Sequence, residues 1–239
     1  TPLGEELARQ GINVRYNCTV KNYIAEANGV AVEMDCGDKL FADAVIISTG
    51  VKPNSALAKE CGLECGPRGH IKVDEHLQTS DPDIFAAGDV VERNECAENA
   101  FSAVPLAGPA NKQGRIAADN IAGKKSVYRN SFGTSVVKIG RLTAASVGLT
   151  EKALRQNGRT YKKLYLHPNS NASYYPGGTR MTLKLLFGDD GMIFGAQIVG
   201  SKGVDKRIDA IACAMRNGLK APELGELELA YAPPYSSAK

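Results

Sequence analysis

The chain has 239 residues and a mass of 25.4 kDa, enough for one large domain or two ordinary ones. It carries 29 basic and 26 acidic residues spread along the sequence, a net charge of +3, which excludes nucleic acid as the main partner. Hydrophobic residues make up 43% of the chain, but no apolar run approaches the ~20 residues that cross a bilayer. We therefore expect a soluble globular protein with no membrane partner.

The cysteines and the first residues bear on the cellular location. The six cysteines are dispersed along the chain: Cys18, Cys36, Cys61, Cys65, Cys96 and Cys213. Nothing points to secretion, so we expect reduced, mostly buried thiols in a cytoplasmic protein. The pair Cys61 and Cys65 lies in a glycine-rich loop with only His70 as a further candidate ligand, which favours a structural role and predicts no metal site. The chain starts at Thr1 in a helix-forming segment without an initiator Met or a signal peptide, so we expect it to begin within a longer protein.

Hydrophobic spacing predicts alternating elements in the first half. The elements expected there are a helix at 2–10, an extended stretch from 12 towards 20, strands at 30–34, 44–48 and 84–87, and helices at 56–60 and 111–122. Asn28-Gly29 is a strong hairpin turn before the strand at 30–34. The run at 44–48 is apolar throughout, which predicts a strand buried on both faces, as in a parallel sheet.

The pattern changes after Gly123. The elements expected there are strands at 136–139, 161–166, 181–187 and 192–199, a short helix at 151–156 capped by Thr150, and an amphipathic helix at 204–217. Paired strands with helices between them predict an α+β domain on an antiparallel sheet.

The strongest chemical signal lies at the end of the strand expected at 84–87. Gly88 and Asp89 follow it directly, and ligands of doubly wound sheets bind at the carboxyl ends of strands. Gly88 allows close approach of a ligand to the backbone, and Asp89 can accept hydrogen bonds from hydroxyl groups. From these residues alone, an ordinary turn with a capping Asp is an equal alternative.

Residues 79–89, TSDPDIFAAGD, are similar to the second flavin-binding motif of the pyridine nucleotide-disulfide oxidoreductases. The resemblance implies that Gly88 and Asp89 bind FAD, with Asp89 on the ribityl chain. Residues 45–50, VIISTG, resemble the family's other glycine motif, which implies that Thr49 and Gly50 also lie at the cofactor. The family usually has Ala where Ser48 stands, but the two motifs occur in the expected order and at the expected distance.

A third segment, Pro105, Leu106 and Ala107, leads towards the helix expected at 111–122. Backbone N–H groups at a helix start stabilise negative charge, which a reduced flavin carries near its pyrimidine edge. In relatives this turn lies beside that edge, so the resemblance assigns the three residues to cofactor binding. Without the resemblance, a simple Pro/Gly loop would account for them.

The end of the chain resembles a narrower branch, the coenzyme A-disulfide reductases with related NADH oxidases and persulfide reductases. Tyr175 in YYPG and Tyr235 in AYAPPYS match two tyrosines that, in the coenzyme A branch, reach the partner subunit's active site. The resemblance implies a catalytic role, because a phenol with an ordinary pKa of ~10 can protonate a departing thiolate. The alternative is that both tyrosines pack at an interface.

Lys202, Lys206 and Arg207 lie at the start of the amphipathic helix. In coenzyme A-using relatives basic residues here face the nucleotide phosphates, and paired cations suit phosphates. The resemblance therefore implies substrate binding by these three residues. The alternative is that they are solvated surface charges.

Other parts of the family pattern do not occur in the chain. No G-x-G is present, and none of the six cysteines matches the family's redox cysteine. We therefore expect this chain alone to lack catalysis and to bind FAD weakly.

The resemblance implies an α/β, partial FAD/NAD(P)-binding Rossmann-like region followed by an α+β dimerisation domain with an antiparallel sheet. We expect residues 1–43 to be the tail of the NAD(P)-binding domain, 44–124 the C-terminal segment of the FAD-binding domain and 125–239 the dimerisation domain. The whole protein would be a homodimer that passes electrons from NADH or NADPH through FAD to a disulfide, persulfide or related low-molecular-weight thiol substrate. The tyrosine pair favours a coenzyme A derivative. The alternatives are an NADH oxidase or peroxidase acting on oxygen or peroxide, and a non-catalytic dimerisation module.

Overall fold

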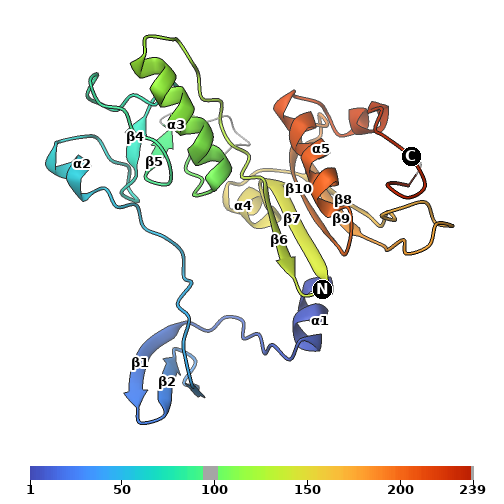
Figure 1. The fold of residues 1–239 in the computed structure, drawn as a ribbon. Helices are drawn as coiled ribbons and strands as arrows, with labels where there is room; N and C mark the ends of the chain where they lie inside the picture. Colours follow the sequence, from blue (N-terminus) through green and yellow to red (C-terminus); the bar gives the residue numbers. More distant parts are fainter. Residues whose placement is uncertain (94–101, 238–239) are drawn as a thin grey trace. The chain divides into compact units, whose positions relative to one another are not determined.

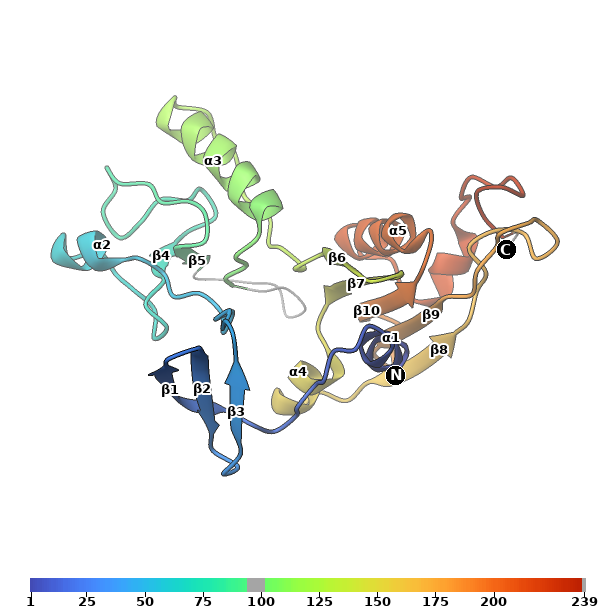
Figure 2. The ribbon, with the colours of Figure 1, turned by 60° about the horizontal axis from the view of Figure 1, so that its bottom comes forward.

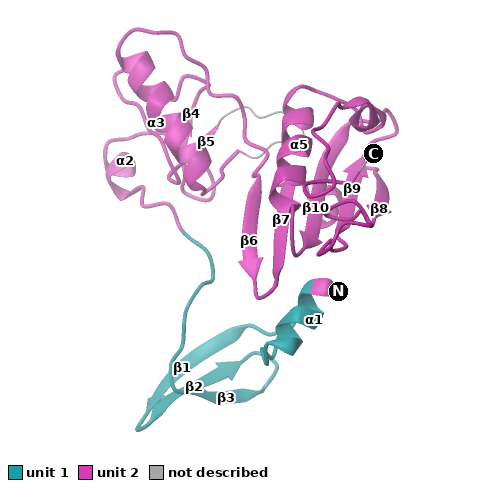
Figure 3. Ribbon diagram, turned by 45° about the vertical axis from the view of Figure 1, so that its right-hand side comes forward, with its two compact units in different colours: residues 1, 3–51 teal, residues 2, 52–239 magenta. Residues whose placement is uncertain are grey.

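The computed structural model describes residues 1–93 and 102–237 of the chain (Figure 1). It divides the chain into two compact units, one of residues 1 and 3–51 and the other of residues 2 and 52–239 (Figure 3). Cys96, one of the six cysteines, lies outside the described residues. No helix in the described part of the chain is both long and apolar enough to cross a membrane.

The first unit holds one helix and a three-stranded antiparallel sheet (Figure 2). Helix α1, Pro2–Arg9, begins at Thr1, whose hydroxyl accepts a hydrogen bond from the Gly4 N–H at 3.2 Å and so caps the helix. The strands are β1 (Val20–Glu26), β2 (Gly29–Met34) and β3 (Lys39–Ala42), in the order β1-β2-β3. Glu26 pairs with Gly29, which confirms the predicted hairpin turn. The buried side chains of this sheet, Ala31, Val32 and Met34, come from the central strand β2.

The strand predicted at 44–48 is wrong. These residues form no strand in the structure, and the side chains of Ile46 and Ile47 are 92% and 64% exposed. A strand buried on both faces needs neighbours that pair its backbone, and no strand among the described residues pairs with this run. The apolar run is therefore an exposed segment without strand pairing in this structure.

The second unit begins with a small parallel pair of strands and two helices. These are α2 (Ala56–Glu60), β4 (Ile71–Val73), β5 (Val91–Arg93) and α3 (Ala107–Ile121). The strand predicted at 84–87 is wrong, because only Phe85 forms a bridge, with Gln78, and the regular strand begins after Asp89. The predicted helix at 111–122 is confirmed, although it begins four residues earlier. A core of Val73, Leu77, Val91, Ala117 and Tyr128 joins the strands to α3.

The rest of the unit is built on a five-stranded antiparallel sheet, which confirms the predicted α+β domain. Its strands are β6 (Ser135–Ile139), β7 (Leu142–Gly148), β8 (Lys162–Leu166), β9 (Thr182–Phe187) and β10 (Ile193–Gly200), in the order β6-β7-β10-β9-β8. The sequence prediction missed β7, whose central residues are small or polar. Helices α4 (Glu151–Gln156) and α5 (Val204–Arg216) occur where they were predicted, and a 3-10 helix, Pro222–Glu226, follows them.

Helices cover both faces of this sheet. Leu185 and Leu186 are neighbours on β9 and therefore point to opposite faces. Leu185 packs in the main core with Ile208 of α5, whereas Leu186 packs in a second cluster with Leu154 of α4. In contrast, the edge strands β6 and β8 keep exposed apolar side chains: Val136, Val137, Leu164 and Leu166.

The expectation of mostly buried thiols is also wrong. Cys36, Cys61 and Cys213 are exposed, and Cys18 and Cys65 are half-buried, so no cysteine of the described residues is fully buried. Their positions explain the difference, since Cys18 and Cys36 flank strands at the surface and Cys61 directly follows the end of α2.

Candidate functional site

Three segments that are distant in sequence meet at one end of the antiparallel domain. They are the loop between β8 and β9, the start of α5, and the C-terminal segment after residue 226. The side chain of Asn171 donates a hydrogen bond to the Pro234 carbonyl, and the Ala172 N–H donates to the Pro233 carbonyl at 3.2 Å. The loop and the C-terminal segment are therefore joined by one side-chain and one backbone hydrogen bond.

Both predicted tyrosines lie in these joined segments. Tyr175 is 39% exposed and Tyr235 is 71% exposed, so both phenols can be reached from solvent. The Tyr175 N–H donates to the Ala172 carbonyl at 2.9 Å, which places it in the same turn as the contact to Pro233. The arrangement brings two candidate proton donors to one end of the domain although they are 60 residues apart in sequence.

Lysines from the start of α5 hold the two segments. Lys206 donates a hydrogen bond to the carbonyl of Tyr235, and Lys202 donates to the carbonyl of Gly177 at 3.1 Å. Both lysines are exposed, so their charges stay available to an anion. Tyr175, Tyr235 and the two lysines therefore belong to segments that are hydrogen-bonded to one another in one surface region.

Arg207 differs from its neighbours because its side chain points into the protein. Only 7% of the residue is exposed, and burial lowers the pKa of its guanidinium. Its Nη atoms donate to the carbonyls of Gly203 at 2.9 Å, Asn169 at 3.2 Å and Ser170 at 3.3 Å. These contacts join the start of α5 to the beginning of the β8–β9 loop.

A second pair of tyrosines, Tyr174 and Tyr231, occurs in the same region, and the sequence reading assigned it no role. A hydrogen bond with the Tyr174 hydroxyl raises the pKa of Tyr231. Both residues stand in the two motifs quoted for the branch, one position before Tyr175 and four before Tyr235. Their position in the motifs was the available signal, but only the fold brings the two hydroxyl groups together.

The predicted flavin-binding turn at Gly88 is held by Gln113, which was not among the predicted site residues. The Gly88 N–H donates to Oε1 of Gln113 at 2.7 Å, and Gln113 is buried on α3. Gly88 has a φ of 92°, which favours glycine, and no atom lies within 4 Å of the place a Cβ would take. Asp89 is exposed next to it. Helical spacing alone could not show which side of α3 meets this turn.

The start of α3 matches the third predicted segment. Leu106 is the N-cap and Ala107 the first helical residue, with Pro105 just before them. Leu106 has no side-chain oxygen that could cap the helix, so within the described residues the first N–H groups of α3 lack an N-cap side chain, an arrangement that suits an anionic ligand. Thr49 and Gly50 are both exposed and belong to the first unit, and Gly50 has a φ of 104°.

A cavity of about 760 Å³ lies away from the predicted residues. It is lined by the first three turns of α3, residues from the segment 127–134 and the C-terminal half of α5, including Lys112, Tyr128 and Arg216. None of the predicted site residues lines it. This cavity therefore does not coincide with the predicted tyrosines, lysines and glycine turn.

A glycine turn backed by a long helix is followed by an α+β domain on an antiparallel sheet. Comparison with known proteins gives the family to which this arrangement belongs. Residues 2–105 match the family model of the pyridine nucleotide-disulphide oxidoreductases, and residues 134–239 match that of the dimerisation domain of the same family. The chain belongs to the pyridine nucleotide-disulphide oxidoreductases.

Individual relatives are similar over almost the whole chain. An NAD(P)H sulfur oxidoreductase (CoA-dependent) from Pyrococcus furiosus is 35% identical over 99% of this chain and 53% of its own length. An NADH oxidase from Methanocaldococcus jannaschii is 35% identical over 96% of this chain and 51% of its own length. The structure of reduced CoADR-RHD from Bacillus anthracis superposes with a TM-score of 0.93 at 43% identity, over 100% of this chain and 43% of that one. The chain thus spans about half the length of the curated relatives it matches.

Proposed function

We propose that this chain is the C-terminal part of a homodimeric, FAD-dependent enzyme that uses NADH or NADPH to reduce a disulfide, persulfide or related low-molecular-weight thiol substrate. A coenzyme A derivative is the substrate that the residues fit best. The observation that carries the proposal is the meeting of Tyr175, Tyr235, Lys202 and Lys206 in one surface region. The name of the Pyrococcus furiosus relative, which is CoA-dependent, supports the same substrate class.

The tyrosines and lysines of this region suit a thiol attached to a nucleotide. When a disulfide or persulfide is reduced, a thiolate leaves, and a phenol with a pKa of ~10 can hold its sulfur by a hydrogen bond or protonate it. Tyr175 and Tyr235 are exposed enough to act in this way. Lys202 and Lys206 offer positive charge to phosphate groups. Arg207, also predicted to bind the substrate, would instead support this site by holding the β8–β9 loop to α5.

The residues of the glycine turn fit FAD. The open space at Gly88, the exposed carboxylate of Asp89 and the uncapped start of α3 give a close backbone approach, a hydroxyl acceptor and a site for negative charge. We assign cofactor binding to these residues and to Pro105, Leu106 and Ala107, and extend it to Thr49 and Gly50 on the strength of their motif. When bound, FAD would supply the transfer of electrons from the reduced nicotinamide towards the sulfur substrate.

We also propose the domain division that the motifs imply, with residues 1–43 as the tail of the NAD(P)-binding domain, 44–124 in the FAD-binding domain and 125–239 as the dimerisation domain. The exposed apolar residues of the edge strands, such as Val137 and Leu164, support an assembly role for the last part.

The test is an assay of NAD(P)H oxidation by the full-length protein with coenzyme A disulfide, coenzyme A persulfide, oxygen and peroxide. The variant is the double substitution Tyr175→Phe/Tyr235→Phe, and the matched control is Tyr165→Phe, an exposed tyrosine on β8 of the same domain. We expect a coenzyme A substrate to be used fastest, and the double variant to lose about 10²-fold or more of that rate, the usual range for a lost proton donor. The control should keep the wild-type rate.

The second candidate is an NADH oxidase or peroxidase, which the similarity to the Methanocaldococcus jannaschii NADH oxidase favours. Fastest turnover with oxygen or peroxide, unchanged in the double variant, would support this candidate and would leave the tyrosines as interface packing.

A further alternative is that this chain by itself is only a dimerisation module. Size-exclusion chromatography with an absorption spectrum separates the two cases, because a module gives a colourless dimer and a cofactor-binding chain gives a yellow one.

A further inference from the structure

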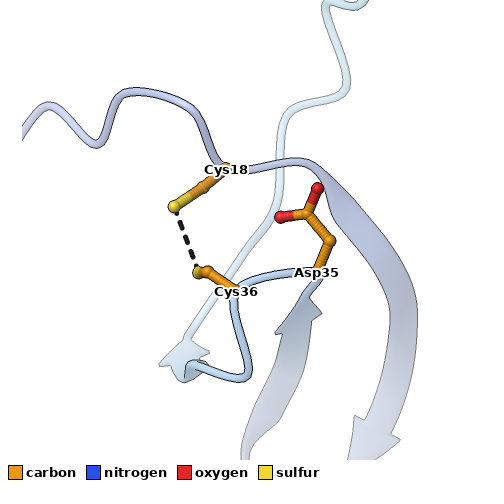
Figure 4. Close-up of side chains that lie close together, drawn as sticks. All are labelled: Cys18, Asp35 and Cys36. Atoms are coloured by element: carbon orange, nitrogen blue, oxygen red, sulfur yellow. Dashed lines mark hydrogen bonds between the residues drawn. The ribbon is translucent and has the colours of Figure 1, made fainter.

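Two cysteines to which no role is assigned above meet at one end of the first unit. The Sγ atoms of Cys18 and Cys36 lie 3.1 Å apart and share a hydrogen bond (Figure 4). Cys36 is exposed and Cys18 is half-buried, so small molecules in solution can reach the pair. Neither residue matches the redox cysteine expected for the family, and the proposed mechanism does not use them.

The strand pairing explains why the two thiols meet. Val20 pairs with Met34 across the antiparallel strands β1 and β2, and the contact continues outwards because the Asp35 N–H donates to the Thr19 carbonyl at 2.9 Å. One residue further on, Cys18 stands opposite Cys36. Residues that face each other across antiparallel strands have Cα atoms about 4.5–5.5 Å apart, within the range that a disulfide spans.

Neighbouring side chains keep the pair in place. The Thr19 N–H also donates to the Asp35 carboxylate at 2.9 Å, and Arg15 forms an ion pair with Asp38 in the same turn. The hydrogen bond with Cys36 and, to a lesser extent, burial and the charges of Asp35 and Asp38 raise the pKa of the Cys18 thiol. Proximity, and not an unusually acidic thiol, is therefore what favours a bond between the two sulfurs.

A metal site explains the cluster less well. Cys18, Cys36 and the Asp35 carboxylate offer three ligand atoms within 4.8 Å of one another. Structural zinc is held by four protein ligands, and the Asp35 carboxylate already accepts a hydrogen bond from the backbone. No further His, Cys, Asp or Glu joins this group among the described residues.

We propose that Cys18 and Cys36 are a site of reversible oxidation, at which a small disulfide converts the two thiols into an intramolecular disulfide. The Cys36 thiolate attacks one sulfur of the small disulfide, which forms a mixed disulfide and releases one small thiolate that takes up a proton. The Cys18 thiolate then attacks the Cys36 sulfur and displaces the second small thiol. The protein loses two electrons and two protons, and the small disulfide becomes two thiols. The new bond ties the entry of β1 to the turn between β2 and β3.

To test this, the full chain is equilibrated at pH 8 in buffers with different ratios of oxidised to reduced glutathione. Free thiols are then blocked with N-ethylmaleimide, and the protein is digested with trypsin. Cleavage after Arg15, Lys21 and Lys39 leaves Cys18 in peptide 16–21 and Cys36 in peptide 22–39, so a disulfide between them gives a linked peptide of unique mass. We expect the linked peptide to dominate in oxidising buffer, to disappear in reducing buffer, and to exceed any linkage that involves Cys61 or Cys213 by at least about tenfold.

The control variant Cys61→Ser should form the linked peptide to the wild-type extent, because this exposed cysteine lies beside α2 in the other unit. In Cys36→Ser the linked peptide should be lost. Recovery of Cys18 and Cys36 only as separate N-ethylmaleimide or glutathione adducts in every buffer would overturn the proposal. So would one equivalent of zinc in the purified protein that protects both thiols from N-ethylmaleimide until a chelator removes it.

Discussion

Arg207 and Lys206 are adjacent basic residues whose replacement by methionine should have opposite consequences. Arg207→Met removes three hydrogen bonds from a charged donor to the carbonyls of Gly203, Asn169 and Ser170. Each such bond contributes about 1.5–3 kcal/mol net, and the two to the loop, at 3.2 and 3.3 Å, belong at the weak end of that range. Removing a charge whose burial is unfavourable offsets part of the loss. We therefore expect the free energy of unfolding to fall by about 2–3 kcal/mol.

Lys206→Met is the matched control because it makes the same replacement at an exposed position of the same helical turn. The hydrogen bond of Lys206 to the Tyr235 carbonyl is exposed, so water can replace it, and the free energy of unfolding should stay within about 0.5 kcal/mol of the wild type. If the proposed function holds, this variant should instead raise the KM for coenzyme A disulfide in the full-length enzyme. Urea denaturation followed by circular dichroism measures the first effect, and steady-state kinetics the second.

If Arg207→Met unfolds at the wild-type urea concentration, the three hydrogen bonds contribute nothing net to stability. A Lys206→Met variant less stable than Arg207→Met would likewise contradict a stabilising role for the buried guanidinium. An unchanged stability of Arg207→Met with a raised KM would show that Arg207 binds the substrate directly and does not support the loop.

Two further perturbations test the dimerisation domain. The hydrogen bond with Lys184, together with those from neighbouring polar groups, lowers the pKa of Glu151 well below its usual value of 4.5. The ionised carboxylate therefore stabilises the fold above about pH 4.5, and this contribution to stability is lost as the pH falls. The difference in urea midpoint between wild type and Glu151→Gln should therefore be largest above pH 4.5 and shrink below it, and a difference that grows on acidification would contradict the assignment. Gly195→Ala would drive a Cβ into the backbone oxygen of Leu149, at a cost of about 1–3 kcal/mol in thermal or urea unfolding. Gly225→Ala, where no atom lies within 4 Å, should change stability by less than about 0.5 kcal/mol, and equal losses in the two variants would contradict the packing argument.

The elements that the sequence predicted well are those whose signals are local. Thr150 caps α4 through the Ala153 N–H at 3.2 Å, and Asn28-Gly29 closes the hairpin between β1 and β2. The amphipathic helix α5 also occurs within one residue of its predicted bounds. Caps, turns and helical periodicity depend on residues within a few positions of one another, so one sequence contains all the information they need.

The order and spacing of motifs also placed the chain in its family, because each motif is a short run of backbone with its own chemistry. What these patterns could not predict depends on the partners that the fold supplies. The apolar run at 44–48 has the composition of a buried strand, yet Ile46 is 92% exposed because no described strand pairs with it. A strand needs hydrogen-bond partners from other segments, and composition does not reveal whether they are present.

Residue order alone shows that two glycine turns, a tyrosine-bearing loop and a basic helix start occur in one chain. How their side chains are used depends on the folded chain. The fold turns Arg207 inwards and leaves Lys206 exposed, hydrogen-bonds Gln113 to Gly88, and brings the Sγ atoms of Cys18 and Cys36 to 3.1 Å. Hydrogen bonds and burial between distant segments follow from strand register and helix packing, and these depend on the whole chain.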